Sequence, residues 1–411
     1  MTKEKAKYQP YFDKFRGMVP YLDIPKKEWS YIKRTFTKSD VRKSLANVLL
    51  DYPLPYSDIS LLDARKAFNK LKGIHQFDIL TEGEWFARGS KVYSNPITID
   101  GTQKYFRKLN AGNDASNYFQ QENRWTVDGS APGPQTSWST EDQIYSVLGS
   151  AYSMKVPKLD KQTLKMLIGL RKYICAQFKP NVAKVIYDMY KAENILDFSA
   201  GWGDRLAGFY ASEYGKFYLG IDPKKENHPL YKKQAEFYAK QLGLFDIPKR
   251  SKFVMEPAED FDYKGYDEFF DLVFTSPPYF TTEKYSYDTT QSWVRYGEID
   301  FWNEMFLHKA LGKIWKTIKP GGYLMVNISD VQSGSAKGDL WLKICDPMIE
   351  FLIKTFDDAQ YIGCYGMEMA ARPNNPGSGT AKEIDRETGE DVGEKIGVFA
   401  EPIWVIRKEI V

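Results

Sequence analysis

The sequence reads ILDFSAGWGDRL over residues 195–206, and this stretch sets the class of fold. An apolar strand ends at Asp197, a tight turn with two glycines follows, and Asp204 opens a helix. Glycines let the backbone come close to a ligand, and the first turn of a helix offers N–H groups without partners. The dinucleotide fingerprint G-x-G-x-x-G fails here, because Leu206 stands three residues after the second glycine. The stretch therefore predicts a nucleotide-type site in an α/β protein other than a dehydrogenase.

Short apolar runs alternate with helical stretches beyond Glu193, which is the pattern of a parallel sheet covered by helices. Strands are expected at 195–199, 217–221, 252–255, 272–275, 323–328, 360–369 and 397–407. Helices are expected over 160–191, with a break at Pro180, and over 301–318, where the run PGG that follows Lys319 is the expected stop. The polar, glycine-rich segment 372–394 is expected to be a mobile loop.

Asp222 follows the strand expected at 217–221. It stands about 20 residues after the glycine turn, where an acid can accept both hydroxyls of a ribose. The alternative is a helix N-cap, since Pro223 and a helical stretch come next. Both interpretations stay open on the sequence.

The most specific stretch is DLVFTSPPYF, residues 271–280. An apolar strand delivers Ser276 and the prolines to its carboxyl end, the edge of an open α/β sheet where ligands bind. An exocyclic amino group is a poor nucleophile, because its lone pair is delocalised into the ring. Acceptors such as the Ser276 hydroxyl and the Pro277 carbonyl could accept hydrogen bonds from both N–H groups of the amino group, while Tyr279 stacks on an extruded base. The alternative is an ordinary turn after a strand.

Composition excludes several other classes of protein. With 43% hydrophobic and 27% charged residues the chain reads as globular. The three cysteines fit neither disulfide nor zinc spacing, which indicates a reducing compartment, and three scattered histidines do not suggest a metal site. No signal-peptide pattern and no run of about 18 apolar residues occurs, so a cytoplasmic protein without a membrane partner is expected.

Taken together, these stretches resemble the S-adenosylmethionine-dependent amino-methyltransferases of DNA, which methylate cytosine N4 or adenine N6. The glycine turn is similar to their motif I, and SPPY is similar to motif IV in the form typical of N4-cytosine enzymes. FKPNVAKVIYDMY (178–190) resembles motif X, and FVMEPAEDF (253–261) resembles motif III. KPGGYLMVNISD and FAEPIWVIRK resemble later strands of that fold. The resemblance covers about 178–408, a little over half of the chain.

The resemblance implies a Rossmann-like methyltransferase sheet, seven-stranded and mostly parallel with an antiparallel last strand. It also implies S-adenosylmethionine as cofactor and direct methyl transfer, without a metal. The residues implied to hold the cofactor are Phe178, Asp197, Ser199, Ala200, Gly201, Gly203, Asp222, Ala258 and Glu259. Those implied to hold the target base and carry catalysis are Ser276, Pro277, Pro278 and Tyr279. Pro257 stands where motif III generally has an acid, which leaves the adenine contact open.

Cytosine N4 in DNA is the expected target, and adenine N6 is the nearest alternative. An RNA or protein-amide methyltransferase generally carries N/D-PPY, and a catalytically silent nucleic-acid-binding module would not need an intact SPPY. A cytosine-C5 enzyme is excluded, because none of the three cysteines follows a proline. The recognition sequence, the oligomeric state and membership of a restriction-modification, regulatory or bacteriophage system stay open.

Two domains are expected: a basic, mainly helical or mixed domain over 1–150 and a catalytic domain over 151–411. Residues 1–75 hold 16 Lys and Arg against 8 Asp and Glu. We expect this stretch to grip double-stranded DNA from which the target base is flipped. Its aromatic residues either stack on bases or form a core, and they are Tyr8, Tyr11, Phe15, Trp29, Tyr31 and Phe36. A chain beginning near Thr140 is expected to keep cofactor binding.

Overall fold

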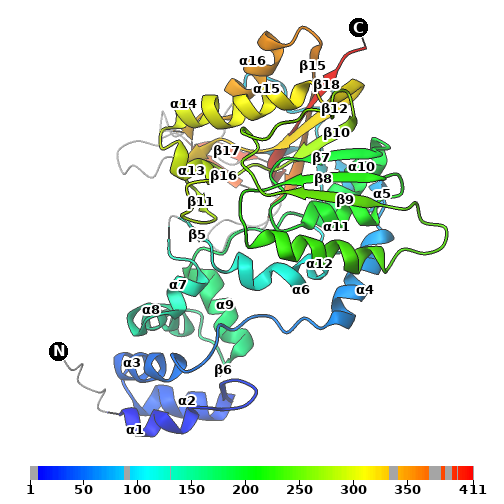
Figure 1. Cartoon of the computed structure of the whole chain (residues 1–411). Helices are drawn as coiled ribbons and strands as arrows, with labels where there is room; N and C mark the ends of the chain where they lie inside the picture. The colour runs from blue at the N-terminus through cyan, green and yellow to red at the C-terminus, as the bar shows by residue number, and fades with distance from the viewer. Residues whose placement is uncertain are drawn as a thin grey trace. The chain divides into compact units, whose positions relative to one another are not determined.

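The computed structural model describes residues 8–87, 93–129, 131–332, 341–369, 381–384, 391–395 and 397–410. The chain forms two compact units, each assembled from separate stretches of sequence (Figure 1). Unit 1 comprises Met1–Ile59, Gln121–Ala176 and Glu283–Tyr285, and unit 2 comprises Ser60–Gln120, Gln177–Thr282 and Ser286–Val411.

Unit 1 is mainly helical. Its elements are α1 (Gln9–Phe12), α2 (Lys26–Thr35), α3 (Lys38–Leu49), α7 (Pro134–Trp138), α8 (Glu141–Ser153), α9 (Lys161–Arg171) and the strand pairs β1 (Asp23–Ile24) with β6 (Leu159–Asp160) and β5 (Asp128–Gly129) with β11 (Glu283–Lys284). The N-caps of α3, α8 and α9 are Thr37, Thr140 and Asp160, whose side chains accept a backbone N–H three residues on.

The N-terminal aromatic residues belong mainly to the core of unit 1. Phe15 and Trp29 are buried, and Tyr8, Tyr11 and Phe36 pack against the same cluster. Among the six aromatic residues named above, only Tyr31 is exposed, at 46% of its surface. The interpretation of this stretch as a base-stacking surface is therefore wrong for Phe15 and Trp29, because the helices of unit 1 use these two rings to fill their interior.

Unit 2 is built on a ten-stranded sheet, whose central strands are labelled in Figure 1. The central order is β9 (Arg250–Val254), β8 (Phe217–Ile221), β7 (Asn194–Asp197), β10 (Phe270–Thr275), β12 (Ile318–Asn327), β18 (Val398–Lys408) and β15 (Ala359–Glu368). The first five of these strands are parallel, and β18 runs antiparallel to β12 and β15. The predicted Rossmann-like sheet, with its antiparallel last strand, is confirmed.

Three further strands enlarge this sheet. They are β2 (Leu80–Glu82), β3 (Trp85–Phe86) and β4 (Lys104–Phe106), of which β4 runs parallel to β15 and β3 runs parallel to the start of β18. These strands come from a stretch that was predicted to belong to an N-terminal domain. The pairing of Tyr105 with Gly366 joins residues far apart in sequence, so no local pattern announces it.

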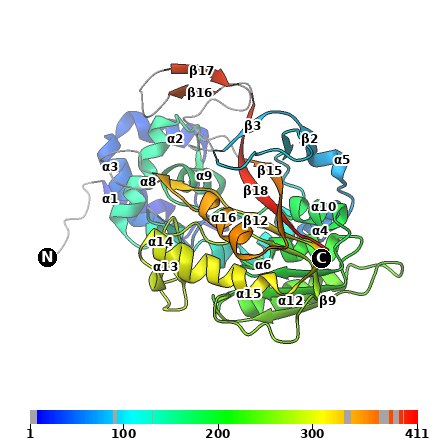
Figure 2. The same ribbon diagram turned by 90° about the horizontal axis from the view of Figure 1, so that it is seen from above.

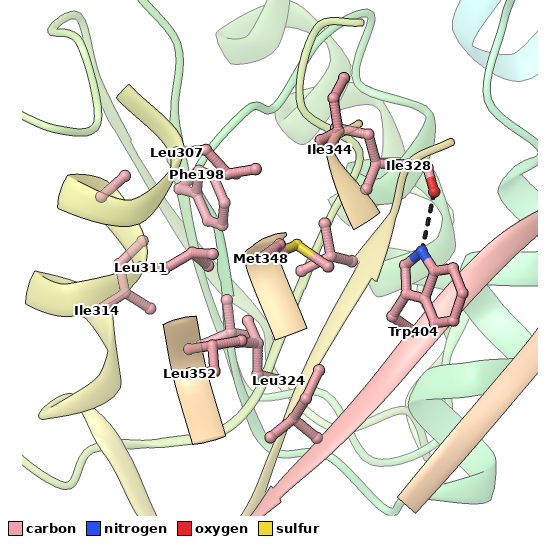
Figure 3. Packing of buried hydrophobic residues seen from close by; sticks show 14 of the residues in the cluster. Phe198, Leu307, Leu311, Ile314, Leu324, Ile328, Ile344, Met348, Leu352 and Trp404 are labelled. Atoms are coloured by element: carbon pink, nitrogen blue, oxygen red, sulfur yellow. Dashed lines mark hydrogen bonds between the residues drawn. The ribbon is translucent and has the colours of Figure 1, made fainter. Parts of the chain in front are cut away.

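Helices cover both faces of the sheet (Figures 1 and 2). One face carries α4 (Leu61–Lys72), α10 (Pro180–Met189), α11 (Asp204–Ala211) and α12 (Asn227–Ala239), and the other carries α14 (Ile299–Trp302), α15 (Lys309–Trp315) and α16 (Cys345–Thr355). Each face has its own hydrophobic core, the first under α4, α10, α11 and α12 and the second under α14, α15 and α16. Along β10, the side chains of Leu272 and Phe274 belong to the first core and that of Val273 to the second, because successive side chains of a strand point to opposite faces. Figure 3 shows the second core, where Leu311, Ile314, Met348 and Leu352 meet and the Trp404 indole donates to the Ile328 carbonyl at 3.0 Å.

Two predictions about the stretch 301–327 need correction. The helix is divided into α14, a π-helical turn η2 (Asn303–His308) and α15, and it ends at Trp315. The run PGG then lies inside β12, where the register between Phe270 and Leu272 slips and Gly321 has φ +80°. Proline and glycine are tolerated in a strand at such a bulge, so here they bend the strand after the helix has already ended.

The break predicted at Pro180 is confirmed, since α9 ends at Arg171 and α10 begins at Pro180. Within the segment predicted to be a loop, 372–394, β16 (Ala381–Ile384) pairs with β17 (Asp391–Lys395). The other residues of that segment lie outside the described ranges.

The compact units divide the chain differently from the predicted boundary at residue 150. Residues 60–120 belong to unit 2, where Phe68 and Leu71 of α4 share a core with α10 and α11. Residues 151–176 belong to unit 1. Across the described ranges, none of the helices combines the length and the apolar character that crossing a membrane requires.

Candidate active site

The turn after β7 has the conformation for which its glycines were predicted. Gly201 and Gly203 have φ of +58° and +72°, and a Cβ atom on Gly203 would lie 2.5 Å from the Gln234 side chain. The Ala200 N–H donates to the Ile221 carbonyl at 3.0 Å, which ties the turn to the end of β8. Helix α11 begins at Asp204, as predicted. The turn therefore presents the Gly201 backbone at the carboxyl edge of the sheet, while the Gln234 side chain fills the space beside Gly203.

Side chains of α12 brace this turn. The Tyr231 hydroxyl donates to the Gly201 carbonyl at 2.5 Å, and the Asn227 amide donates to the same oxygen at 2.9 Å. The Gln234 amide donates to the Trp202 carbonyl at 3.2 Å. These bonds satisfy carbonyls that a tight turn cannot pair within itself, so they hold its shape.

A second brace involves Ser116, a residue that sequence reasoning assigned to the N-terminal domain, together with Gln177. Ser116, on α6 (Asn113–Arg124), and Gln177 both donate to the Asp204 carboxylate, Gln177 at 2.8 Å. Gln177 also donates to the carbonyl of Asn113 at 2.8 Å. No sequence signal identifies this support, because it depends on a contact between stretches almost ninety residues apart.

Asp197 is completely buried at the centre of a polar network. Its carboxylate accepts from Arg205 at 2.7 and 3.1 Å, from the Tyr218 hydroxyl at 2.6 Å, from the Thr275 hydroxyl at 2.9 Å and from the Ser199 N–H at 3.3 Å. Burial lowers the pKa of Arg205, but Asp197 outweighs this effect and raises it, so the guanidinium stays charged. Asp197 thus joins the turn to β8 and β10, and its role toward a cofactor stays a prediction.

Asp222 lies directly after β8 and beside the glycine turn. One carboxylate oxygen accepts from the Gly201 N–H at 2.9 Å and the other from the Lys224 N–H at 2.8 Å. Helix α12 begins later, with Glu226 at its N-cap position, so the N-cap interpretation of Asp222 is wrong. Burial raises the pKa of Asp222, although the two N–H groups oppose this effect. Its carboxylate is in place to accept further hydrogen bonds from a ligand at the turn.

Ala258 and Glu259 follow β9 at the same edge of the sheet, and both are buried. One oxygen of Glu259 accepts from Arg295 at 2.5 Å and from the Tyr296 hydroxyl at 3.2 Å. The other oxygen, Oε2, is buried and has no hydrogen-bond partner within the described ranges. Burial raises the pKa of Glu259. A buried acceptor without a partner is costly unless a ligand supplies a donor.

The tetrapeptide Ser276–Tyr279 follows β10 at this edge, as predicted. Pro277 is buried, whereas Ser276, Pro278 and Tyr279 are partly exposed. In the part of the chain that the structure describes, neither the Ser276 hydroxyl nor the Pro277 carbonyl makes a hydrogen bond. The Tyr279 ring packs against the core shown in Figure 3, so only part of its surface is available to a ligand.

Phe280 is a residue that sequence reasoning missed. Its φ is +48°, which is rare for a bulky side chain, and its buried ring meets Trp302 at a centroid distance of 6.0 Å. Strained backbone of this kind concentrates at functional sites. Phe178, predicted from the motif X resemblance, lies with its ring 5.0 Å from the Arg205 guanidinium carbon.

The structure thus places the predicted residues at the ends of four neighbouring parallel strands. The glycine turn follows β7, Asp222 follows β8, Glu259 follows β9 and Ser276 follows β10. Two hydrogen bonds, Gly201–Asp222 and Thr275–Asp197, join three of these places. Thr275, Arg205 and Tyr218 were not predicted.

No protein-family model matches the chain, and no curated protein matches it significantly. Solved structures with some likeness include the N-methyltransferase NodS of Bradyrhizobium japonicum, at 12% identity over 53% of this chain and 78% of that one, with a TM-score of 0.30. An rRNA methylase from Streptococcus thermophilus matches at 10% identity over 57% and 99%, with a TM-score of 0.31. The 1,6-didemethyltoxoflavin-N1-methyltransferase of Burkholderia thailandensis matches at 16% over 56% and 78%, with a TM-score of 0.30. These values carry no conclusion about activity, substrate or cofactor.

Proposed function

We propose that this protein is an S-adenosylmethionine-dependent methyltransferase that methylates an exocyclic amino group of a DNA base, with cytosine N4 as the target. The observation that carries the proposal is the pair of open acceptors at Ser276 and Pro277. They lie immediately beyond Thr275, whose hydroxyl is bonded to Asp197 beneath the glycine turn. Acceptors for an amino group and a turn for a nucleoside therefore stand at neighbouring strand ends.

The residues at the other strand ends fit S-adenosylmethionine. The turn at Gly201 leaves room for backbone to approach the ligand, and Asp222 would accept the two ribose hydroxyls. Glu259 Oε2, which is buried without a partner among the described residues, would accept the adenine amino group. When bound, S-adenosylmethionine supplies a methyl group on a positively charged sulfur.

The chain's own residues would prepare the acceptor nitrogen. Ser276 Oγ and the Pro277 carbonyl oxygen accept hydrogen bonds from its two N–H groups and turn its lone pair out of conjugation with the ring. The partly exposed face of Tyr279 stacks on the base and holds it outside the duplex. After transfer, the methylated nitrogen loses one proton to solvent and the neutral amine remains.

Exposed basic side chains of unit 1 support DNA as the substrate. Helices α2 and α3 expose Lys26, Lys27, Arg34, Lys38 and Lys43. Such side chains bind phosphates without regard to sequence. The serine before the two prolines favours cytosine N4 over adenine N6, because the family resemblance associates that form with N4 enzymes.

The decisive experiment is mass spectrometry of nucleosides from DNA incubated with the protein and S-adenosylmethionine. We expect N4-methylcytosine. N6-methyladenine would move the target while keeping the mechanism, and methylated nucleosides in RNA alone would replace the substrate. No methylated nucleoside in DNA or RNA would refute the proposal.

The Ser276→Ala variant ties any product to this site. Loss of one polar contact to the reacting nitrogen should lower turnover about 10- to 1000-fold. The dissociation constant of S-adenosylmethionine, measured by calorimetry, should stay close to that of the unmodified protein. Equal loss of cofactor binding and turnover would show that Ser276 serves the cofactor instead.

A further inference from the structure

A buried carboxylate connects the glycine turn with the strand that carries the SPPY tetrapeptide. Asp197 belongs to β7, and among its donors Thr275 is the last residue of β10. We infer that Thr275 is a positioning residue for the proposed methyl transfer, because its hydroxyl fixes Ser276 and Pro277 relative to the turn. The inference rests on the proposed function.

The hydrogen bond lies where the backbone pairing between β7 and β10 stops. The two strands pair at Leu272 with Ile195 and at Val273 with Leu196, and their register ends there. The side chain of Thr275 reaches Asp197 two residues later, at 2.9 Å. On the other side, Thr275 still pairs with Val326 of β12. The Thr275 hydroxyl therefore links β10 to β7 at a point where their backbones no longer pair.

Beyond Pro277 the tetrapeptide makes local backbone hydrogen bonds, from the Phe280 N–H to the Pro278 carbonyl at 3.1 Å and from the Thr282 N–H to the Tyr279 carbonyl at 2.9 Å. Pro277 and Pro278 carry no N–H group, and neither Ser276 Oγ nor the Pro277 carbonyl has a partner within the described ranges. Those two oxygens must stay open to serve an amino group. On the N-terminal side, the position of both acceptors depends on the residue that precedes them, which is Thr275.

The carboxylate is a firm anchor for this bond. Asp197 is 0% exposed, and Arg205 and Tyr218 hold both of its oxygens. Arg205 also donates to the Ser199 carbonyl, which fixes the first residues of the turn. Because Arg205 neutralises the carboxylate, loss of the Thr275 donor leaves the anchor paired, so the fold should survive while the link to the tetrapeptide is broken.

The test compares variants that each remove one buried threonine hydroxyl. Thr275→Val replaces the hydroxyl by a methyl group of similar size. Thr317→Val is the matched control, because the Thr317 hydroxyl is also buried and donates to the Ile314 carbonyl at 2.7 Å, just before β12 and away from the carboxyl ends of the strands. The measurements are methyl transfer to DNA, calorimetric affinity for S-adenosylmethionine, and hydrogen exchange of the backbone amides of Ser276, Tyr279 and Phe280. We expect Thr275→Val to lower turnover about 10- to 100-fold. Cofactor affinity should change less than about threefold, and the three amides should exchange about tenfold faster.

Thr317→Val should leave the turnover and the exchange of those three amides near the values of the unmodified protein. The inference is overturned if Thr275→Val matches the unmodified protein in both measurements, or if Thr317→Val reproduces its effects. If Thr275→Val does not fold, Thr275→Ser and Thr275→Ala make the same comparison, since both lack the methyl group. Serine should keep turnover and alanine should lose it, and equal turnover in both would overturn the inference. If the unmodified protein methylates nothing, the proposed function fails, and the exchange data alone decide whether Thr275 holds the tetrapeptide.

Discussion

At Gly203 a side chain would lower stability in two ways, through backbone strain and through collision with a neighbouring side chain. Its φ of +72° disfavours any other residue, and a Cβ atom would lie 2.5 Å from Gln234. Gly265 has a similar φ of +87° but nothing within 4 Å of the added atom. Gly265→Ala should therefore cost about 1–2 kcal/mol of unfolding free energy. Gly203→Ala should cost about 1–3 kcal/mol more, measured by chemical denaturation. Equal costs would mean that Gln234 moves aside freely.

Asp222 should make cofactor binding sensitive to acid. Its ionised carboxylate accepts hydroxyl groups, and burial raises its pKa, so the ionised form disappears as pH falls through a value above that of an ordinary aspartate. Affinity for S-adenosylmethionine should thus fall on the acid side. Asp222→Asn should lower affinity about 10- to 100-fold at neutral pH.

Calorimetry across pH checks this prediction. The unmodified protein and the Asp222→Asn variant are compared, each carrying Glu259→Gln as well. The second substitution removes the Glu259 carboxyl group, because burial also raises its pKa. The acid-side loss of affinity should then disappear in the Asp222→Asn protein. An identical pH profile with and without Asp222 would assign the titration to another group.

At the scale of elements, Tyr173 supports the short pair of β5 and β11. The Tyr173 hydroxyl donates to the buried Glu283 carboxylate at 2.8 Å, and a Cβ atom on Gly129 would lie 2.7 Å from the Tyr173 ring. Gly129→Ala should displace the ring and cost about 1–3 kcal/mol. Hydrogen exchange of residues 128–129 and 283–285 should then speed up.

Gly169 provides the control within unit 1. It lies inside α9, and a Cβ atom there would meet Ile174 at an ordinary 3.6 Å. Gly169→Ala should stabilise the helix by about 0.5–1 kcal/mol and leave the exchange of β5 and β11 unchanged. Faster exchange in this variant too would show that the effect is not local to the strand pair.

For the whole molecule, the question is whether unit 1 grips DNA. Of the basic residues of α2 and α3, Arg34 and Lys43 are exposed, whereas Arg42 donates twice to the Tyr145 carbonyl and lies 3.6 Å from its ring centroid. Reversal of Arg42 would damage the fold, so it is left in place. Arg34→Glu with Lys43→Glu should weaken DNA binding and lower the slope of log affinity against log salt by about 0.9 for each phosphate that the protein no longer neutralises.

The control reverses Lys232 and Lys233, which are exposed on α12 of unit 2. Filter binding at several salt concentrations measures both double variants. An equal loss of affinity in the two double variants would attribute the effect to net charge. Unchanged affinity in the Arg34 and Lys43 variant would show that these residues of α2 and α3 do not bind DNA.

The composition of the two units also changes what a truncated protein can be expected to do. A chain beginning near Thr140 would lack α4, β2, β4 and Ser116, all of which belong to unit 2. It would expose the core around Phe68 and remove one brace of Asp204. We therefore no longer expect such a chain to keep cofactor binding, and full-length variants are the sound comparison.

The sequence by itself determined the parts of this protein that depend on neighbouring residues. The strand, turn and helix around Gly203, the acid after β8 and the tetrapeptide after β10 follow from apolar periodicity, glycine and proline, whose effects are local. Only the tertiary structure decided that residues 60–120 extend the sheet, that the N-terminal rings form a core, and that Asp197 bonds Thr275 across 78 positions of the chain. Such pairings depend on which distant surfaces meet when the core is buried, and no short stretch of sequence contains both partners.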